Sequence, residues 1–188
     1  QQVFPAGVLS AVSGGDELGK WMTVHSDINK IAFTGSTETG RHVMRSAADT
    51  IKRVTLELGG NDPAIVMPDA DPKALAEHLF WGAFQNNAQF CNVIKRLYIH
   101  EDIYEEVRDA LADFIAINIK VGDGTEADTD LGPIQNSMQY GKVKDYFSDC
   151  HANGYKFALG GEIDESAPGW FVPVSLVDNP PDNSRIVV

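Results

Sequence analysis

Two patterns of hydrophobic residues alternate along this chain of 188 residues, one typical of strands and the other typical of amphipathic helices. Short apolar runs, typical of buried strands, are predicted as strands at residues 8–12, 30–34, 53–58, 64–67, 95–100, 155–159 and 170–177. Apolar residues recur on one helical face within residues 18–22, 43–47, 75–83, 103–114 and 140–150. Strands that alternate with helices are joined by crossover connections, so the predicted fold class is α/β with a mostly parallel sheet.

The charge balance excludes several classes of partner. The chain has 27 acidic and 15 basic residues, a net charge of -12, which repels phosphate backbones and anionic lipid. No apolar run is long enough for an export signal or a membrane span. We therefore expect neither nucleic acid nor membrane as a partner.

Only two cysteines are present, Cys91 and Cys150. They form no C-x-x-C pair and have no histidine nearby at ligand spacing, so neither a disulfide framework nor a metal site is expected. This usage fits a reducing compartment and predicts a cytoplasmic protein. Cys150 shares the inward face of its predicted helix with Val143 and Phe147, which indicates a structural role.

Cys91 lies in the stretch "FQNNAQFCN", residues 84–92, where a helical pattern gives way to polar residues. Free cysteines are most often buried spacers, which favours an inert thiol. A thiol at the junction of a helix and a polar loop can instead be exposed and activated as a nucleophile. Both interpretations remain open on the residues alone.

Glu57 comes near the end of a predicted strand in "LELGGNDP", residues 56–63. Two glycines follow it, which let the backbone turn sharply and approach a ligand. A carboxylate flanked by Leu56 and Leu58 is expected to hold its proton more tightly, as suits a general base. The alternative is a strand-end glutamate paired with Lys52 or Arg53.

The stretch "FTGSTETG", residues 33–40, predicts a strand, a glycine turn and a helix start. Gly35 allows close approach, Ser36 or Thr37 can cap the helix, and the helix amides favour a phosphate. The motif is neither a Walker loop nor the G-x-G-x-x-G fingerprint, and an ordinary strand-to-helix turn has the same pattern.

Taken in order, these three stretches resemble the aldehyde dehydrogenase superfamily. "LELGGNDP" is similar to its glutamate signature, "FQNNAQFCN" to its cysteine signature, and the interval from Glu57 to Cys91 is the one that the family shows. "KIAFTGSTETGR" resembles its pyrophosphate-contacting segment. Further similarity, in "PAGVLSAVSG", "RLYIHEDIYEEV", "GPIQNSMQYGKV" and "WFVPVSLVDN", extends the resemblance over essentially the whole chain.

The resemblance implies that NAD or NADP is the cofactor and an aldehyde the substrate. Cys91 would form a thiohemiacetal and then a thioester, and Glu57 would activate water to hydrolyse the thioester. The resemblance assigns cofactor binding to Gly35, Ser36, Thr37, Gly40, Leu58 and Gly14. Residues 1–57 would be the end of a Rossmann-like cofactor domain, and residues 58–188 the start of a cysteine-bearing catalytic domain.

The sequence departs from the family pattern in the cysteine segment. Ala88 stands where the family has a glycine, and Val93 is larger than its usual counterpart. If position 88 requires a positive φ, the methyl group there costs about 1 kcal/mol or more.

The ends of the chain suggest part of a longer protein, because it starts with Gln1 and stops on the apolar run "SRIVV". The family's oxyanion asparagine, ribose-contacting lysine and Glu-x-Phe-Gly-Pro glutamate have no counterpart here. We therefore expect this chain alone to be inactive or nearly so, and the full-length protein to be a homo-oligomer.

Two rival functions remain. A dehydrogenase that transfers the acyl group to coenzyme A would typically lack a glutamate base, so Glu57 argues against it. A non-catalytic association fragment of the same fold is favoured by Ala88 and by the missing asparagine.

Overall fold

A computed structural model describes residues 3–188 and divides the chain into two compact units, Gln1–Gly59 and Gly60–Val188. The predicted first domain begins with Gln1 and Gln2, which lie outside the described residues. We describe each unit by itself.

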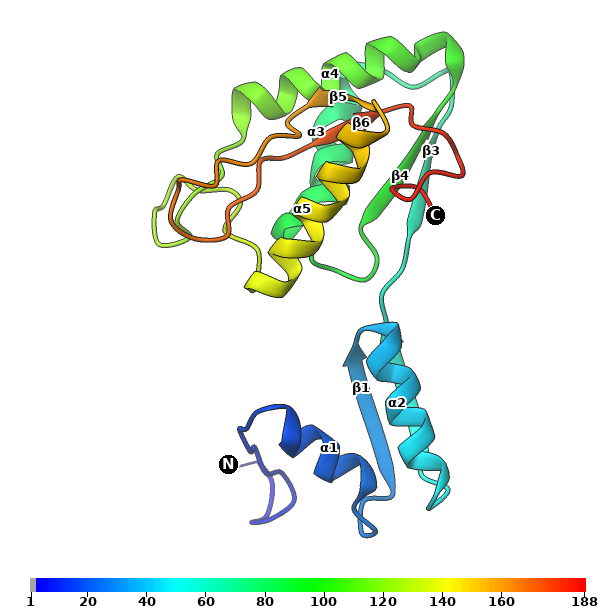
Figure 1. The fold of residues 1–188 in the computed structure, drawn as a ribbon, viewed down its shortest axis with the longest axis vertical. Helices are drawn as coiled ribbons and strands as arrows, with labels where there is room; N and C mark the ends of the chain where they lie inside the picture. Colours follow the sequence, from blue (N-terminus) through cyan, green and yellow to red (C-terminus); the bar gives the residue numbers. More distant parts are fainter. Residues whose placement is uncertain (1–2) are drawn as a thin grey trace. The chain divides into compact units, whose positions relative to one another are not determined.

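The first unit contains one parallel strand pair. Its elements are α1 (Asp16–Val24), β1 (Lys30–Gly35), α2 (Thr37–Ala48) and β2 (Arg53–Leu58) (Figure 1). β1 and β2 pair in parallel, with Thr34 opposite Glu57 and Gly35 opposite Leu58. On α2, Val43 and Ala47 are buried, four residues apart as one helical face requires.

The strand predicted at residues 8–12 is not formed. These residues are irregular and exposed, and β1 and β2 pair only with each other. An apolar run needs a neighbouring strand to satisfy its backbone groups, and this one has none in the described part of the unit.

The second unit begins with a β–α–β crossover. In chain order, its elements are β3 (Asp62–Val66), α3 (Pro72–Phe84), η1 (Gln85–Ala88), β4 (Ile94–Ile99), η2 (Glu101–Ile103), α4 (Tyr104–Asn118), α5 (Ser137–Ala152), β5 (Lys156–Leu159) and β6 (Leu176–Asp178) (Figure 1). β3 and β4 are parallel, whereas β5 and β6 are antiparallel. Asp71 caps α3 with a carboxylate oxygen that accepts from the Lys73 and Ala74 amides, and Pro72 takes the first helical position.

The alternation of helices and strands and the predominance of parallel pairing are confirmed, in three two-stranded sheets. The last predicted strand, residues 170–177, is reduced to β6. Pro173 has no amide hydrogen to give to a ladder, so pairing starts only beyond it, at Leu176.

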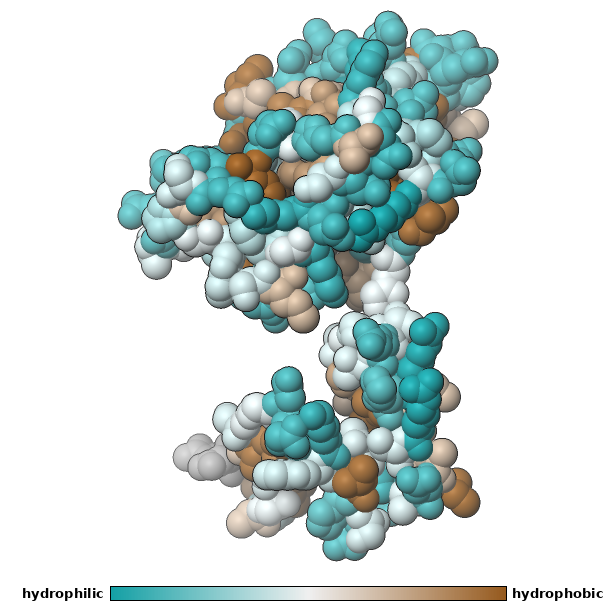
Figure 2. All heavy atoms as spheres, viewed as in Figure 1, coloured by the Kyte–Doolittle hydropathy of each residue, from teal (hydrophilic) through white to brown (hydrophobic). Residues whose placement is uncertain are grey.

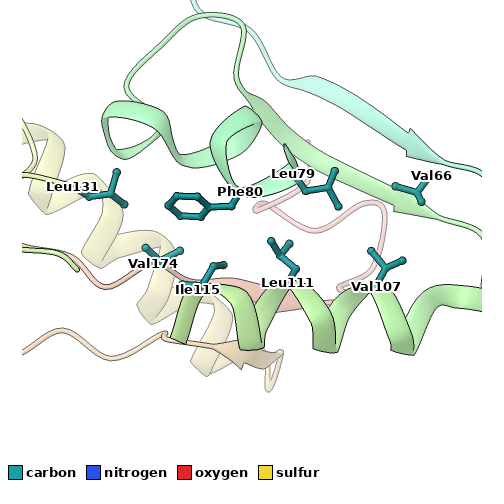
Figure 3. Close-up of a cluster of buried hydrophobic side chains, with 8 residues drawn as sticks. All are labelled: Val66, Leu79, Phe80, Val107, Leu111, Ile115, Leu131 and Val174. Carbon is teal, nitrogen blue, oxygen red and sulfur yellow. The ribbon is translucent and has the colours of Figure 1, made fainter. Parts of the chain in front are cut away.

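The core of the second unit lies between α3 and α4 and is closed by β3 and by later loops. Its buried residues are Val66, Leu79, Phe80, Val107, Leu111, Ile115, Leu131 and Val174. Figure 3 shows that Val107, Leu111 and Ile115 project from α4 toward Leu79 and Phe80. This packing fixes α3, and with it the point at which the Cys91 segment leaves the helix.

A polar contact joins α4 to β6. The Tyr104 hydroxyl donates to Asp178 Oδ1 at 2.5 Å. Burial, followed by this hydrogen bond, raises the pKa of Tyr104 to about 12.

The visible face of the second unit is largely hydrophilic with scattered apolar residues (Figure 2). Within residues 3–188, every helix is too short or too polar to cross a lipid bilayer.

Candidate active site

The residues predicted to contact the cofactor meet, with one exception, at the carboxyl edge of the β1–β2 pair. Gly35 ends β1 opposite Leu58, the last residue of β2. Ser36 caps α2, and its Oγ accepts a hydrogen bond from the Thr39 amide at 3.2 Å. The backbone amides of the first turn of α2, which begins at Thr37, have no carbonyl partner within the helix. The exposed start of α2 can therefore bind an anion.

Gly40 is buried and faces β2. A Cβ at position 40 would lie 2.7 Å from a methyl carbon of Leu58, so a larger residue would require this leucine side chain to shift. Gly40 therefore contributes to the packing of α2 against β2.

Gly14 is the exception, because it lines an open depression formed by residues 10–22 at the start of α1. Two acidic residues, Asp16 and Glu17, occupy the first turn of α1, whereas the first turn of α2 contains only Glu38. The extra negative charge makes the start of α1 the poorer place for a phosphate.

Glu57 is exposed on β2, one residue before the strand ends. Leu56 and Leu58 are half-buried on the opposite face, because successive residues of a strand point to opposite sides. The two leucines that flank Glu57 in the sequence therefore do not enclose its carboxylate.

The alternative for Glu57, an ion pair with Lys52 or Arg53, is absent from the described residues. Lys52 is buried, and its ammonium donates to the His25 carbonyl at 2.7 Å and to Thr50 Oγ1 at 2.6 Å. The Glu57 carboxylate has no cationic partner within this part of the chain.

A left-handed turn leads from α3 into the Cys91 segment. The φ angles are 52° at Asn86, 54° at Asn87 and 58° at Ala88. Asparagine tolerates this region, whereas the methyl group of alanine is disfavoured there. The conditional expectation for Ala88 is thus confirmed, since the position has a positive φ.

The side-chain amides of Asn87 and Gln89 connect this turn to residues 132–135 through hydrogen bonds. Asn87 Nδ2 donates to the Gly132 carbonyl. Gln89 Oε1 accepts from the Gln135 amide at 2.9 Å, and its Nε2 donates to the Asn86 carbonyl at 3.0 Å. These bonds compensate for the unfavourable φ angles.

The two thiols have different environments. Cys91 is exposed, whereas Cys150 is fully buried on α5. Burial, with the charge of Asp149 as a smaller contribution, raises the pKa of Cys150, as expected for an inert core thiol. Val93, two residues after Cys91, is 5% exposed, so its larger side chain is accommodated in the interior.

Among residues 3–188, no three His, Cys, Asp or Glu side chains are grouped so that they could hold a metal ion. The candidate chemistry is therefore carried by Glu57 and the β1–β2 edge in the first unit, and by Cys91 in the second.

Residues 1–188 match the model of the aldehyde dehydrogenase family. The chain belongs to this family. A probable aldehyde dehydrogenase from Pseudomonas sp is 45% identical over 188 residues, covering 100% of this chain and 38% of the relative. The chain therefore spans less than half the length of this relative.

Two solved aldehyde dehydrogenases share the fold. Succinate-semialdehyde dehydrogenase from Burkholderia pseudomallei aligns with a TM-score of 0.89 and 36% identity, over 97% of this chain and 38% of its own. A mutant of aldehyde dehydrogenase C from Pseudomonas syringae, in complex with NAD+ and octanal, aligns with a TM-score of 0.84 and 31% identity, over 90% of this chain and 35% of its own.

Two contacts of the Cys91 segment were not predicted from the sequence of this family member. The ammonium of Lys95 donates to carbonyls of the segment, and Gly60 lies against the Cys91 carbonyl. The glycine pair at 59–60 was a sequence signal for close approach, although not for approach to Cys91. No local sequence pattern predicts the contacts of Lys95, because the positions of the carbonyls that it binds depend on how the turn folds.

The strained alanine generates a stability prediction. Ala88→Gly should raise the free energy of unfolding by about 1 kcal/mol, since glycine has no penalty at a φ of 58°. Urea unfolding followed by circular dichroism measures this change.

Ala116→Gly is the matched control, because Ala116 is exposed within α4. There the same substitution should lower the free energy of unfolding by about 1 kcal/mol. A destabilising Ala88→Gly would contradict the left-handed assignment.

Proposed function

We propose that this chain carries the nucleophile and the general base of an NAD(P)-dependent dehydrogenase that oxidises an aldehyde to a carboxylic acid. The family match over residues 1–188 is the observation that carries the proposal. The exposure of Cys91, at the end of a turn that needs three positive φ angles, supports its role as the nucleophile.

In the first half of the reaction, the Cys91 thiolate attacks the aldehyde carbon and forms a C–S bond, and the carbonyl oxygen becomes an oxyanion. The Cys91 amide can donate to this oxyanion. When the oxyanion reforms the carbonyl, hydride leaves the same carbon and a thioester remains on Cys91.

The second half is hydrolysis. Glu57 takes a proton from water, and the resulting hydroxide adds to the thioester carbon. The C–S bond then breaks, the Cys91 thiolate is restored and the acid is released.

NAD or NADP, when bound, supplies the hydride acceptor. The residues that would hold it are those of the β1–β2 edge and the α2 start, Gly35, Ser36, Thr37, Gly40 and Leu58, with Gly14 less well supported. The capped helix start with unpaired amides fits a pyrophosphate. The Pseudomonas syringae relative was solved as a complex with NAD+, which supports the choice of a nicotinamide cofactor.

We further propose that residues 1–57 end a Rossmann-like cofactor domain and that residues 58–188 begin the catalytic domain. Because relatives such as that from Pseudomonas sp are covered over only 38% of their length, we propose that this chain alone gives no more than background aldehyde-dependent NADH production.

For the whole protein, we propose a cytoplasmic homo-oligomer that acts on a small-molecule aldehyde and binds neither nucleic acid nor membrane. Acyl transfer to coenzyme A is the less favoured outcome, because Glu57 would have no role as a base in it. A purely associative function requires that Cys91 have no special reactivity.

Cys91 should be alkylated selectively. At neutral pH, iodoacetamide should modify Cys91 about five-fold faster in the folded protein than in urea and leave Cys150 unmodified, since a catalytic thiol is activated by its fold. Peptide mass spectrometry over a time course measures both rates, and Cys91→Ser identifies the modified site. A Cys91 that reacts no faster when folded would contradict a nucleophilic role and favour the associative alternative.

Glu57→Gln should separate the two halves of the reaction. With p-nitrophenyl acetate, the variant should acylate Cys91 in an unchanged burst but release acetate about 100-fold more slowly, because general-base catalysis of hydrolysis is lost. Glu38→Gln, which removes an exposed carboxylate of the same unit, should behave like the unmodified protein. Equal deacylation rates in both variants would exclude Glu57 as the base.

A further inference from the structure

A single ammonium group contacts most of the carbonyls around Cys91. Lys95 Nζ donates to the carbonyls of Phe90 at 3.3 Å, Cys91 at 3.0 Å and Val93 at 3.3 Å. An ammonium has three donors, so all of them are used within one turn of the chain. Hydrogen bonds from a charged donor are stronger than those between neutral groups.

The contacts to Phe90 and Cys91 fall on the two peptide planes that flank the Cys91 Cα. The plane with the Phe90 carbonyl also contains the Cys91 amide, and the next plane contains the Cys91 carbonyl. Because each peptide unit is planar, holding both carbonyls restricts the direction of the Cys91 amide and both backbone torsions at this residue. The direction of the Cα–Cβ bond, and hence the range of positions open to the thiol, follows from these torsions.

Gly60 confines the Cys91 carbonyl from another direction. A Cβ at position 60 would lie 2.9 Å from that backbone oxygen, which is too close for any side chain without a shift of the turn. Gly60 does not have a positive φ, so the glycine is required for space and not for conformation. The neighbouring Gly59 has no atom within 4 Å of such a Cβ.

The nearest cationic neighbour along the chain is engaged elsewhere. Arg96 Nε donates to the Asn61 carbonyl at 2.9 Å, and its guanidinium also donates to the Tyr98 hydroxyl at 3.2 Å. Within the described residues, Lys95 is thus the cation that binds the carbonyls of the Cys91 turn.

We infer that Lys95 is a positioning residue for the reaction: with Gly60, it holds both peptide planes at Cys91, so that the thiol faces the aldehyde carbon while the amide faces the aldehyde oxygen. This inference rests on the proposed function. Lys95 needs no contact with substrate for this role, because it acts through the backbone of the nucleophile.

The test compares Lys95→Met, Lys95→Arg and the control Lys156→Met, an exposed lysine on β5. Two quantities are measured on each purified protein: amide hydrogen exchange of residues 91–93, and the rate of Cys91 alkylation by iodoacetamide. Lys95→Met should speed exchange about ten-fold and slow alkylation toward the rate in urea, because the turn loses its charged donor. Lys95→Arg should retain, at least in part, the slow amide exchange and the fast alkylation of the unsubstituted protein. Lys156→Met should change neither the exchange rate nor the alkylation rate.

Gly60→Ala tests the position of the Cys91 carbonyl separately from the charge of Lys95. It displaces the Cys91 carbonyl and leaves the ammonium in place, so it should also speed exchange and slow alkylation, whereas Gly59→Ala should not. Unchanged exchange in Lys95→Met, or no recovery in Lys95→Arg, overturns the inference. The proposed function is judged separately, by whether Cys91 of the unsubstituted protein reacts faster when folded than in urea.

Discussion

Parallel pairing of β3 with β4 is the constraint on which the Cys91 segment depends. Two parallel strands start at the same edge of a sheet, so the chain must return from the end of α3 to the edge where β3 began. Residues 85–93 complete this return, and Cys91 near their end lies beside Gly60. The contact of Gly60 with the Cys91 carbonyl follows from this topology, although the two residues are far apart in sequence.

Parallel pairing also determines where the motif residues lie in the first unit. There β1 and β2 are also parallel, and their carboxyl ends bring Gly35, Ser36 and Leu58 to one edge with Glu57. The chain then passes from the carboxyl end of β2 to the amino end of β3 through residues 59–61 alone.

Residues 85–93, which lead from α3 to β4, adopt backbone torsions that cost free energy, and side-chain contacts offset this cost. Three consecutive residues, Asn86 to Ala88, have positive φ angles, which only asparagine and glycine adopt readily. Side-chain amides of Asn87 and Gln89 bind the backbone of residues 132–135, and buried Val93 anchors the other end of the turn. A turn with unfavourable backbone torsions, held by side-chain contacts and ending in an exposed thiol, is typical of a functional site rather than of an ordinary connection.

The sequence by itself determined the elements whose causes are local. Short apolar runs predicted β1 and β2, and Asp71 with Pro72 predicted the start of α3, because these signals act within a few residues. The three motifs, read with the family resemblance, also singled out Cys91 and Glu57. Only the tertiary structure decided the rest: residues 8–12 form no strand without a partner, Glu57 lies on the face away from its leucine neighbours, and Lys95 and Gly60 flank the Cys91 carbonyl. These outcomes depend on which backbone groups find partners across long sequence separations, and no local pattern encodes such partners.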